Sequence, residues 1–535
     1  MSRRFRAEHL AQTAVAALIL LPLLAAFLGQ GGLADAYSAD DGSGALSARR
    51  WTLAAACGRS LLIGMLAMAG ALVLGIPAGW ALAQRRRPLW LLVLVALPLA
   101  LPPSVSVSGW IGLLAPSGVA SAFNMGFQEA TRGWLFSVIG VSAVLAGCLW
   151  PLVALEFWPG FQRARNGAYE AALLYGSRTR SFFRVVLPQA KGEVAAGALL
   201  VFLLASSDFS VCSLLLVRTL PVEIHDALTL GKTASAAWAS LPLLLMVVAL
   251  AVLSARLHSP ALPGARTAAD TSAVRPGRIA DLFVLAGISL GFALPLLVCL
   301  VQVLRGGRPM SAVFGAGTDA LQVSVRMAGA AALLSIVLGI LRLVFWPQSR
   351  ARPINAACLI LLTVPGSFLA AAFLSIQLNL TKWLMPGGES TLASALPAAI
   401  LTVGYVARFS YIPLRLVDEG LAALDPDLMN AAAVAGHGRL SRAVSVALPL
   451  LGPHLAAGAA LVLVLGLGEV AMADRLAAPG AVPATVWLFQ QQHMGYDEAV
   501  FGLSLLLGAL SAACLLLAGW VASALMRMLG RNSAA

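Results

Sequence analysis

Twelve long apolar stretches constrain the fold of this 535-residue chain more than any other feature. Each is close to the roughly 20 residues that a helix needs to cross the hydrocarbon core of a bilayer. Backbone groups in lipid must be hydrogen-bonded within their own segment, so runs of this length predict helices. The sequence therefore predicts an all-α membrane protein with about twelve spans. They lie near residues 10–29, 58–83, 89–115, 134–157, 193–217, 239–257, 280–304, 321–346, 354–379, 391–412, 454–474 and 500–526.

Composition agrees with this interpretation. Hydrophobic residues make up 60% of the chain and charged residues 11%, whereas soluble domains average about 25% charged residues. A net charge of +13 suggests nucleic acid as the partner of a soluble protein, but basic cytoplasmic loops also orient membrane proteins, and we adopt that explanation. The first apolar stretch follows a basic N-terminus without a clear cleavage site, so we interpret it as an uncleaved span.

The Lys and Arg residues predict the orientation of the spans. If the N-terminus is cytoplasmic and the spans alternate, 25 of the 36 Lys and Arg residues fall on cytoplasmic segments, among them Arg342 and Arg408. Both termini are therefore predicted to be cytoplasmic. The segment 259–278 is rich in Pro, Gly, Ala and Ser and has the composition of a cytoplasmic linker. It separates a first six-span domain, 1–258, from a second, 279–535.

The two halves repeat one another. Residues 170–176 read EAALLYG and residues 430–436 read NAAAVAG, and a Leu-Pro pair follows each segment. The glycines of these segments are 260 residues apart and the following prolines 261. Because both halves begin on the same side, they are predicted to form a parallel repeat about an axis along the membrane normal. Other landmarks recur at nearly the same offset: Leu74-Gly75 with Leu338-Gly339, Pro102 or Pro103 with Pro365, and Asp208 with Glu469.

The duplicated segment resembles the EAA motif of ATP-binding-cassette (ABC) importer permeases. Small alanines let a short helix enter a partner's groove, glycine permits a turn, and proline marks the start of the next helix. The first copy is one residue shorter between glycine and proline, and in the second Asn430 stands where Glu is usual. The matching residues are Glu170, Ala171, Ala172, Gly176, Leu187 and Pro188 in the first copy, and Ala431, Ala432, Gly436, Leu448 and Pro449 in the second.

The resemblance implies two tandem six-helix domains of the type I ABC importer permease in a bacterial inner membrane. It also implies two copies of a cytoplasmic ABC ATPase docked on the paired loops, a periplasmic solute-binding protein and membrane lipid as partners, and no nucleic acid. No cofactor is expected in this chain, because ATP and Mg bind to the ATPase. Fused domains, together with segments 466–480 and 493–499, resemble the ferric-iron and thiamine permeases. Ferric iron is the favoured solute, and thiamine or a polyamine is the alternative.

Catalytic patterns are missing from the sequence. Gly231-Lys232-Thr233 looks like the end of a Walker A motif, but Asp226 stands where its first glycine is needed. The six histidines and six cysteines are scattered, so neither a catalytic residue nor a metal site is predicted. An ion-coupled secondary transporter is the alternative from another class, and a membrane scaffold is a third. The first would need titratable groups deep in several spans, and few are present.

Two carboxylates within apolar stretches suggest a solute pathway. Charges within spans are costly and usually face a cavity or a partner, so we hypothesise that Asp208 and Glu469 line the pathway and favour a cationic solute. The alternative is that each one fixes the packing of a neighbouring helix or lies at a span end. Pro102 and Pro365, each near small polar residues, would break spans at matching places, which points to a transport path. Simple helix kinks are the alternative for these prolines.

Overall fold

A computed structural model describes most of the chain. The described residues are 43–85, 89–115, 118–119, 133–164, 168–257, 278–315, 317–345, 351–384, 391–478 and 480–532. The predicted first span at 10–29 and almost all of the predicted linker at 259–278 lie outside them. Seven described helices are long and apolar enough to cross a membrane, and four bent helix pairs raise the possible total to eleven spans. The expected all-α membrane fold is confirmed.

The helices have the following bounds. Before the predicted linker they are α3 (Ser43–Ala83), α4 (Leu89–Ala100), α5 (Pro103–Leu114), α7 (Val138–Ala164), α8 (Ala168–Tyr175), α9 (Arg178–Ser181), η2 (Phe182–Val186), α10 (Leu187–Gln189), α11 (Lys191–Ser206), α12 (Ser210–Leu214), α13 (Leu220–Thr229) and α14 (Thr233–Leu257). After it they are α15 (Arg278–Ile288), η3 (Ser289–Ala293), α16 (Leu294–Arg305), α17 (Met310–Gly315), α18 (Thr318–Phe345), α19 (Ala351–Thr363), α20 (Gly366–Leu384), α21 (Thr391–Phe409), α22 (Tyr411–Ala423), α23 (Pro426–Val434), α24 (Arg439–Arg442), η5 (Ala443–Ala447), α25 (Leu448–Gly468), α26 (Ala471–Leu476), α27 (Ala484–Met494) and α28 (Glu498–Asn532).

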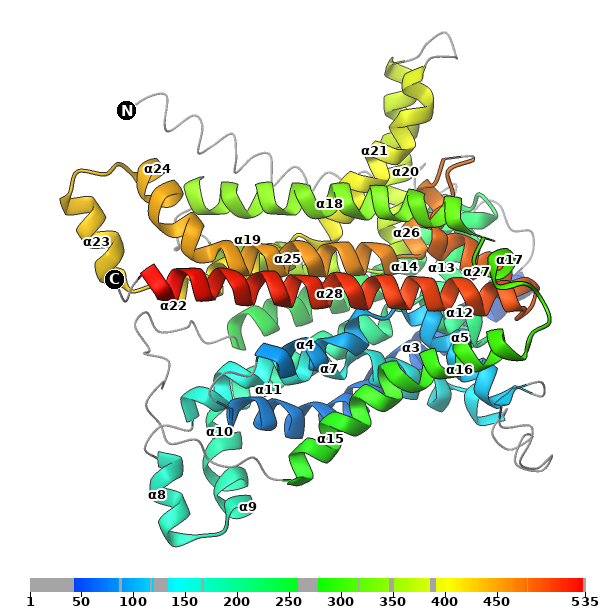
Figure 1. The fold of residues 1–535 in the computed structure, drawn as a ribbon. Coiled ribbons are helices and arrows are strands. Elements are labelled where there is room, and N and C mark those ends of the chain that lie inside the picture. Colours follow the sequence, from blue (N-terminus) through cyan, green and yellow to red (C-terminus); the bar gives the residue numbers. More distant parts are fainter. Residues whose placement is uncertain are drawn as a thin grey trace.

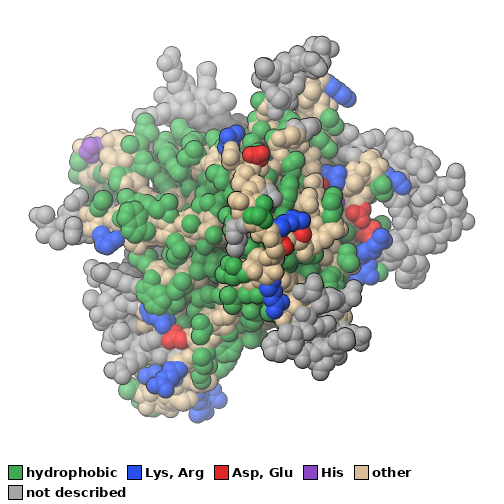
Figure 2. All heavy atoms as spheres, turned by 45° about the vertical axis from the view of Figure 1, so that its right-hand side comes forward, with side chains coloured by type: hydrophobic (Ala, Val, Ile, Leu, Met, Phe, Trp, Pro, Cys, Tyr) green, Lys and Arg blue, Asp and Glu red, His purple; other side chains and the backbone are tan. Residues whose placement is uncertain are grey.

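The long helices run roughly along one direction, and short helices gather at both ends of the bundle (Figure 1). Helices α8 and α9 project from the left end of Figure 1, as do α23 and α24, while α12, α13, α26 and α27 lie at the right end. Figure 2 shows that hydrophobic side chains cover much of the visible face, with basic and acidic side chains scattered among them. This surface suits contact with lipid.

Two spans are broken at matching prolines. Helices α4 and α5 meet at 77°, and α19 and α20 meet at 102°. The Pro102 carbonyl accepts a hydrogen bond from the Val105 amide (2.9 Å), and the Pro365 carbonyl accepts one from the Phe368 amide (3.0 Å). Each proline thus starts a new helix, because its fixed φ suits a first turn and its missing N–H costs nothing there. These angles exceed those of simple kinks.

Two predicted spans end earlier than the sequence indicated. The stretches at 193–217 and 454–474 were expected to be helical throughout, but α11 ends at Ser206 and α25 ends at Gly468. A short helix follows each one, and an acidic side chain accepts hydrogen bonds from its first turn. The apolar composition hid this interruption because a single carboxylate, Asp208 or Glu469, marks each helix end.

The seventh predicted span, formed by α15, η3 and α16, packs against helices of the first half. A Cβ atom built at Gly291 would overlap the carbonyl oxygen of Gly147, so the two backbones approach closely. Gly287 lies against the Trp150 ring in the same way. At one end of this span, Arg85 Nη2 lies 2.8 Å from Asp281 Oδ1. Small residues permit such contact in lipid, where close packing rather than the hydrophobic effect holds helices together.

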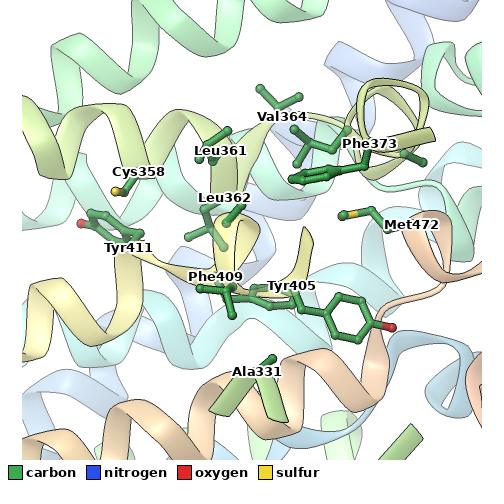
Figure 3. Close-up of a cluster of buried hydrophobic side chains, with 14 of the residues drawn as sticks. Ala331, Cys358, Leu361, Leu362, Val364, Phe373, Tyr405, Phe409, Tyr411 and Met472 are labelled. Carbon is green, nitrogen blue, oxygen red and sulfur yellow. The ribbon is translucent and has the colours of Figure 1, made fainter. Parts of the chain in front are cut away.

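A large buried apolar cluster surrounds the break between α19 and α20 (Figure 3). Val364, directly before the break, is fully buried. Met472 from α26 reaches toward Phe373 from α20, and its methyl group lies where a Cβ at Gly404 would stand. The broken span is therefore held by side chains from α20, α21 and α26, which fixes the position of the helix start at Gly366.

Because Gly291 and Gly147 lie so close together, even an alanine at position 291 is predicted to lower the stability of the chain. Gly291→Ala should destabilise the chain by about 1–3 kcal/mol, because the backbone must move to admit one methyl group. Gly329→Ala is the matched control, because a Cβ there meets nothing within 4 Å. Thermal unfolding in detergent, followed by tryptophan fluorescence, measures both. Equal melting temperatures for the two variants would contradict the packing of this span.

Candidate functional site

The first EAA-like loop is a pair of short helices, α8 and α9, at one end of the bundle (Figure 1). Glu170 and Ala171 are exposed on α8, and Ala172 is half-buried. Tyr169 anchors α8, since its ring lies 5.2 Å from that of Trp80 on α3 in an edge-on contact. The far end of α8 instead exposes apolar surface: Leu174 is 82% exposed and Tyr175 91%.

The turn and exit of this loop use serine and proline. Ser177 caps α9 by accepting a hydrogen bond from the Arg180 amide (3.4 Å), while Gly176 does not adopt a positive φ. Leu187 and Pro188 form the one-turn helix α10. The chain then bends by 76° at Ala190 before α11 begins. The chain thus turns at Gly176 and Ser177 as expected, but without a positive φ at the glycine.

The second loop is built from α23 and α24. Asp425 caps α23 by accepting a hydrogen bond from the Asp427 amide (3.0 Å). Asn430 and Ala431 are exposed on this helix, Ala432 is half-buried, and Val434 is 90% exposed.

Helix α23 ends in a Schellman motif. The His437 amide donates to the Ala432 carbonyl (3.0 Å), and the Gly436 amide donates to the Ala433 carbonyl (3.1 Å). Gly436 has a φ of +82°, which a residue with a Cβ adopts only at a cost. Leu448 and Pro449 then begin α25, and the helix is continuous from Leu440 to Gly468.

The one-residue difference between the loops falls in the turn. Helix α9 starts two residues after Gly176, whereas α24 starts three residues after Gly436. From there the two loops match: each has a five-residue π-helical turn, η2 or η5, directly before its Leu-Pro pair. The structure thus places the alanines of each motif on the first short helix, the glycine in the turn and the Leu-Pro pair where the next helix begins.

Asp208 and Glu469 have matching structural roles. Asp208 Oδ1 accepts a hydrogen bond from the Val211 amide (2.8 Å), and its Oδ2 accepts one from Ser210 Oγ (3.3 Å). Glu469 Oε1 accepts a hydrogen bond from the Met472 amide (3.1 Å). Each carboxylate thus caps the short helix that follows a long span, α12 or α26.

Only one of these carboxylates has a basic partner among the described residues. Arg408 Nε lies 3.4 Å from Glu469 Oε2, and the two side chains are 12% and 10% exposed. Asp208 has no such ion pair within the described part of the chain. Gly366 leaves room for the pair, because a Cβ there would touch both Arg408 and Glu469.

The two carboxylates lie at the contact between the halves. Asp208 and Glu469 are close enough to interact electrostatically. Pro102 lies against Gly468, 3.5 Å from where a Cβ would stand, and the rings of Phe209 and Phe489 are 5.3 Å apart. Since Pro365 directly precedes Gly366, the structure gathers all four predicted pathway residues around one region.

Buried hydroxyl groups accompany both broken spans. The Oγ atoms of Ser104, Ser106, Ser207 and Ser367 are buried and have no hydrogen-bond partner. Such groups are costly in an apolar interior. The sequence pointed to small polar residues near both prolines, but not to their burial without partners.

At the right end of Figure 1 a second polar contact joins the halves. Arg475 Nη2, on α26, lies 3.0 Å from His225 Nε2 and also donates to Thr229 Oγ1, both on α13. Burial, together with the nearby Arg475 guanidinium and the His493 side chain, lowers the pKa of His225 to about 3. The imidazole is therefore neutral and accepts the hydrogen bond from Arg475.

Two arginines differ from the sequence-based expectation. Arg342 and Arg408 were counted on cytoplasmic segments, but both side chains are buried in ion pairs. Arg342 Nη2 lies 2.6 Å from Asp418 Oδ1, and its side chain is 1% exposed. Burial of arginine depends on an acidic partner from another helix, which a count of charges along the sequence does not reveal. When these two residues are left out, most Lys and Arg residues still fall on the segments predicted to be cytoplasmic.

Comparison with known proteins identifies relatives. No family model matches the chain, and no solved structure matches it either. It is 27% identical to the thiamine transport system permease protein ThiP of Escherichia coli, over 80% of this chain and 82% of that protein.

Two other relatives match part of the chain at 32% identity. A probable molybdenum ABC transporter permease of Haloferax volcanii aligns over 34% of this chain and 65% of its own length. The spermidine/putrescine permease PotB of Haemophilus influenzae aligns over 27% and 52%. The nearly full-length match, the all-α membrane fold and the two motif loops agree. The chain therefore resembles ABC importer permeases of the fused type, and it matches the thiamine permease over most of its length.

Proposed function

We propose that this chain is the membrane subunit of an importer for a thiamine-like organic cation. A periplasmic binding protein delivers the solute, and two copies of a separate cytoplasmic ATPase drive its passage. The observation that carries the proposal is the pair of matched two-helix loops on one end of the bundle (Figure 1). An ion-coupled transporter has no use for such a pair.

Exposed apolar side chains support docking of a protein on these loops. Leu174 and Tyr175 on the first loop, and Val434 on the second, are each more than 80% exposed. Large apolar groups on an exposed helix end mark interaction sites. In this proposal the residues from Glu170 to Pro188 and from Asn430 to Pro449 form the two docks.

The proposed orientation sets the paired loops in the cytoplasm. The excess of Lys and Arg on the segments assigned to that side supports this arrangement, with both termini inside and the chain in the inner membrane. ATP and Mg then bind to the ATPase alone, and this chain performs no covalent chemistry. It alternates between inward-open and outward-open forms as the ATPase closes and reopens.

The identity of the solute is the finer part of the proposal. The sequence favoured ferric iron through segments 466–480 and 493–499. The residues of these segments have structural roles: Glu469 caps α26, Arg475 contacts α13, and His493 lies 2.8 Å from the Phe489 carbonyl. The resemblance of these segments to the ferric-iron and thiamine permeases therefore reflects a shared structure and does not identify the solute. A relative that matches 80% of the chain is a thiamine permease, so we put thiamine first.

Reconstitution tests the function directly. The chain, the ATPase that copurifies with it and the binding protein are combined in liposomes, and uptake of labelled thiamine is followed with and without ATP. We expect ATP-dependent uptake that spermidine and ferric iron do not inhibit. Inhibition by ferric iron would restore the first choice of solute. Uptake driven by an ion gradient without ATP would contradict the importer itself.

Gly436 provides a test of the second dock. Gly436→Val should cost about 1–2 kcal/mol of stability, because a residue with a Cβ is strained at positive φ, and should abolish stimulation of the ATPase. Gly231→Val is the control, since Gly231 has a φ of +71° and equally open surroundings but lies away from both loops. It should show the same loss of stability and normal ATPase activity. Equal ATPase activity in the two variants would count against the dock.

The pathway hypothesis predicts different outcomes for the two carboxylates. Asp208→Asn keeps a capping side chain, so the fold should persist while uptake of a cation falls about tenfold, equivalent to about 1.4 kcal/mol. Glu469→Gln leaves Arg408 buried without its counter-ion and should cost about 3–5 kcal/mol of stability. Uptake assays and thermal unfolding separate the two effects. Undiminished uptake in Asp208→Asn and in the variant that combines Asp208→Asn with Glu469→Gln would contradict the pathway hypothesis.

A further inference from the structure

We infer that the two ATPase docks are chemically unequal: the first attracts an acidic surface of its ATPase copy, and the second binds mainly by apolar contact. This inference rests on the proposed function. Asn430, in the place where Glu is usual, raises the question of whether the two docks are equivalent. Charged residues elsewhere in the loops carry the inference that they are not.

The second short helices of the loops align without a gap. From Arg178 and Arg439, through η2 and η5, to the prolines, every position is offset by 261 residues. Three positions on this shared path differ in charge. Arg180 corresponds to Ser441 and Arg184 to Ser445, whereas Ser181 corresponds to Arg442.

The extra arginines face solvent, whereas the serines are used within their own loop. Arg180 and Arg184 are exposed. Ser441 Oγ lies 2.9 Å from His437 Nδ1, and Ser445 Oγ donates to the Ser441 carbonyl (2.5 Å). The serines thus stabilise the turn and present no charge to a partner.

The remaining charges increase the contrast. The matching segments 165–188 and 425–449 contain four arginines with one glutamate and two arginines with two aspartates, respectively. The net charges are therefore +3 and 0. In the second loop Arg442 is half-buried and donates to the Met429 carbonyl (3.5 Å), so it is turned toward α23. Asp425 and Asp427 are exposed at the start of that helix.

Apolar contact is available at both docks. Leu174 and Tyr175 are exposed on the first loop, and Leu428 and Val434 on the second. Two identical ATPase copies would therefore contact similar apolar side chains with the same groove. Only the copy on the first loop would also meet exposed arginines at the edge of the contact. Rim charges mainly raise association rates and make binding sensitive to salt.

Salt dependence distinguishes the docks. The full chain is placed in nanodiscs of phosphatidylcholine and titrated with the copurifying ATPase at about 0.1 M and about 1 M NaCl, between which the Debye length falls from about 10 Å to about 3 Å. We expect two binding events, one weakened about three- to tenfold by salt and one nearly unaffected.

Exchanging the residues provides matched variants. Arg180→Ser with Arg184→Ser removes the two exposed arginines that the second loop lacks, and both binding events should become insensitive to salt. Ser441→Arg with Ser445→Arg does the reverse, and both should become sensitive. Thermal unfolding checks that each variant remains folded. The reverse pair keeps the experiment decisive if the first pair fails to fold.

Three results would overturn the inference. One is a salt dependence that the Arg180→Ser, Arg184→Ser variant leaves unchanged. Another is salt-sensitive binding that appears only in nanodiscs containing anionic lipid, because the arginines would then serve lipid headgroups. The third is the absence of ATPase binding by the wild-type chain at either salt concentration, which would refute the proposed function itself.

Discussion

The hydrogen bonding of helix ends inside an apolar bundle is the constraint on which this structure depends. Lipid offers no partner to a free amide or carbonyl, so a span can end or turn only where the chain supplies one. Pro102 and Pro365 start helices without an amide N–H that would need an acceptor, and Asp208 and Glu469 accept hydrogen bonds from amides beyond two other helix ends. These four residues permit non-helical backbone at the contact between the halves, where a solute path needs it.

The two halves share this framework, but the negative charges of their capping carboxylates, Asp208 and Glu469, are balanced in different ways. Counting back five residues from Pro413 in the second half reaches Arg408, and the same count from Pro151 in the first reaches Ala146. The arginine neutralises Glu469, whereas Ala146 is small and buried, and its neighbour Gly147 lets Gly291 approach. Where the second half has an ion pair, the first has space for the seventh span. Asp208 is left with hydrogen-bond donors alone among the described residues.

The sequence was sufficient for features that are local and insufficient for those that depend on distant partners. Long apolar runs predicted the spans, and the repeated motif predicted paired loops, because both are written in consecutive residues. The early ends of α11 and α25 were missed, since one carboxylate within an apolar run does not reveal which amides it caps. The burial of Arg342 and Arg408 was missed because Asp418 and Glu469 lie far away in sequence. The motif and pathway roles themselves stay predictions.

The connection from each loop to the carboxylate that caps the next short helix also differs between the halves. In the second half one continuous helix runs from Leu440 to Gly468 and ends directly at Glu469. A displacement of the second dock along this helix would therefore reach the Arg408 ion pair without an intervening joint. In the first half the path bends by 76° at Ala190 before α11 leads to Asp208. A movement of the first dock must change direction at that bend before it reaches Asp208. The first loop, which carries the more positive charge, therefore has the less direct mechanical connection to its carboxylate. Equal motion of two ATPase copies would thus act first on the ion-paired carboxylate and later on Asp208.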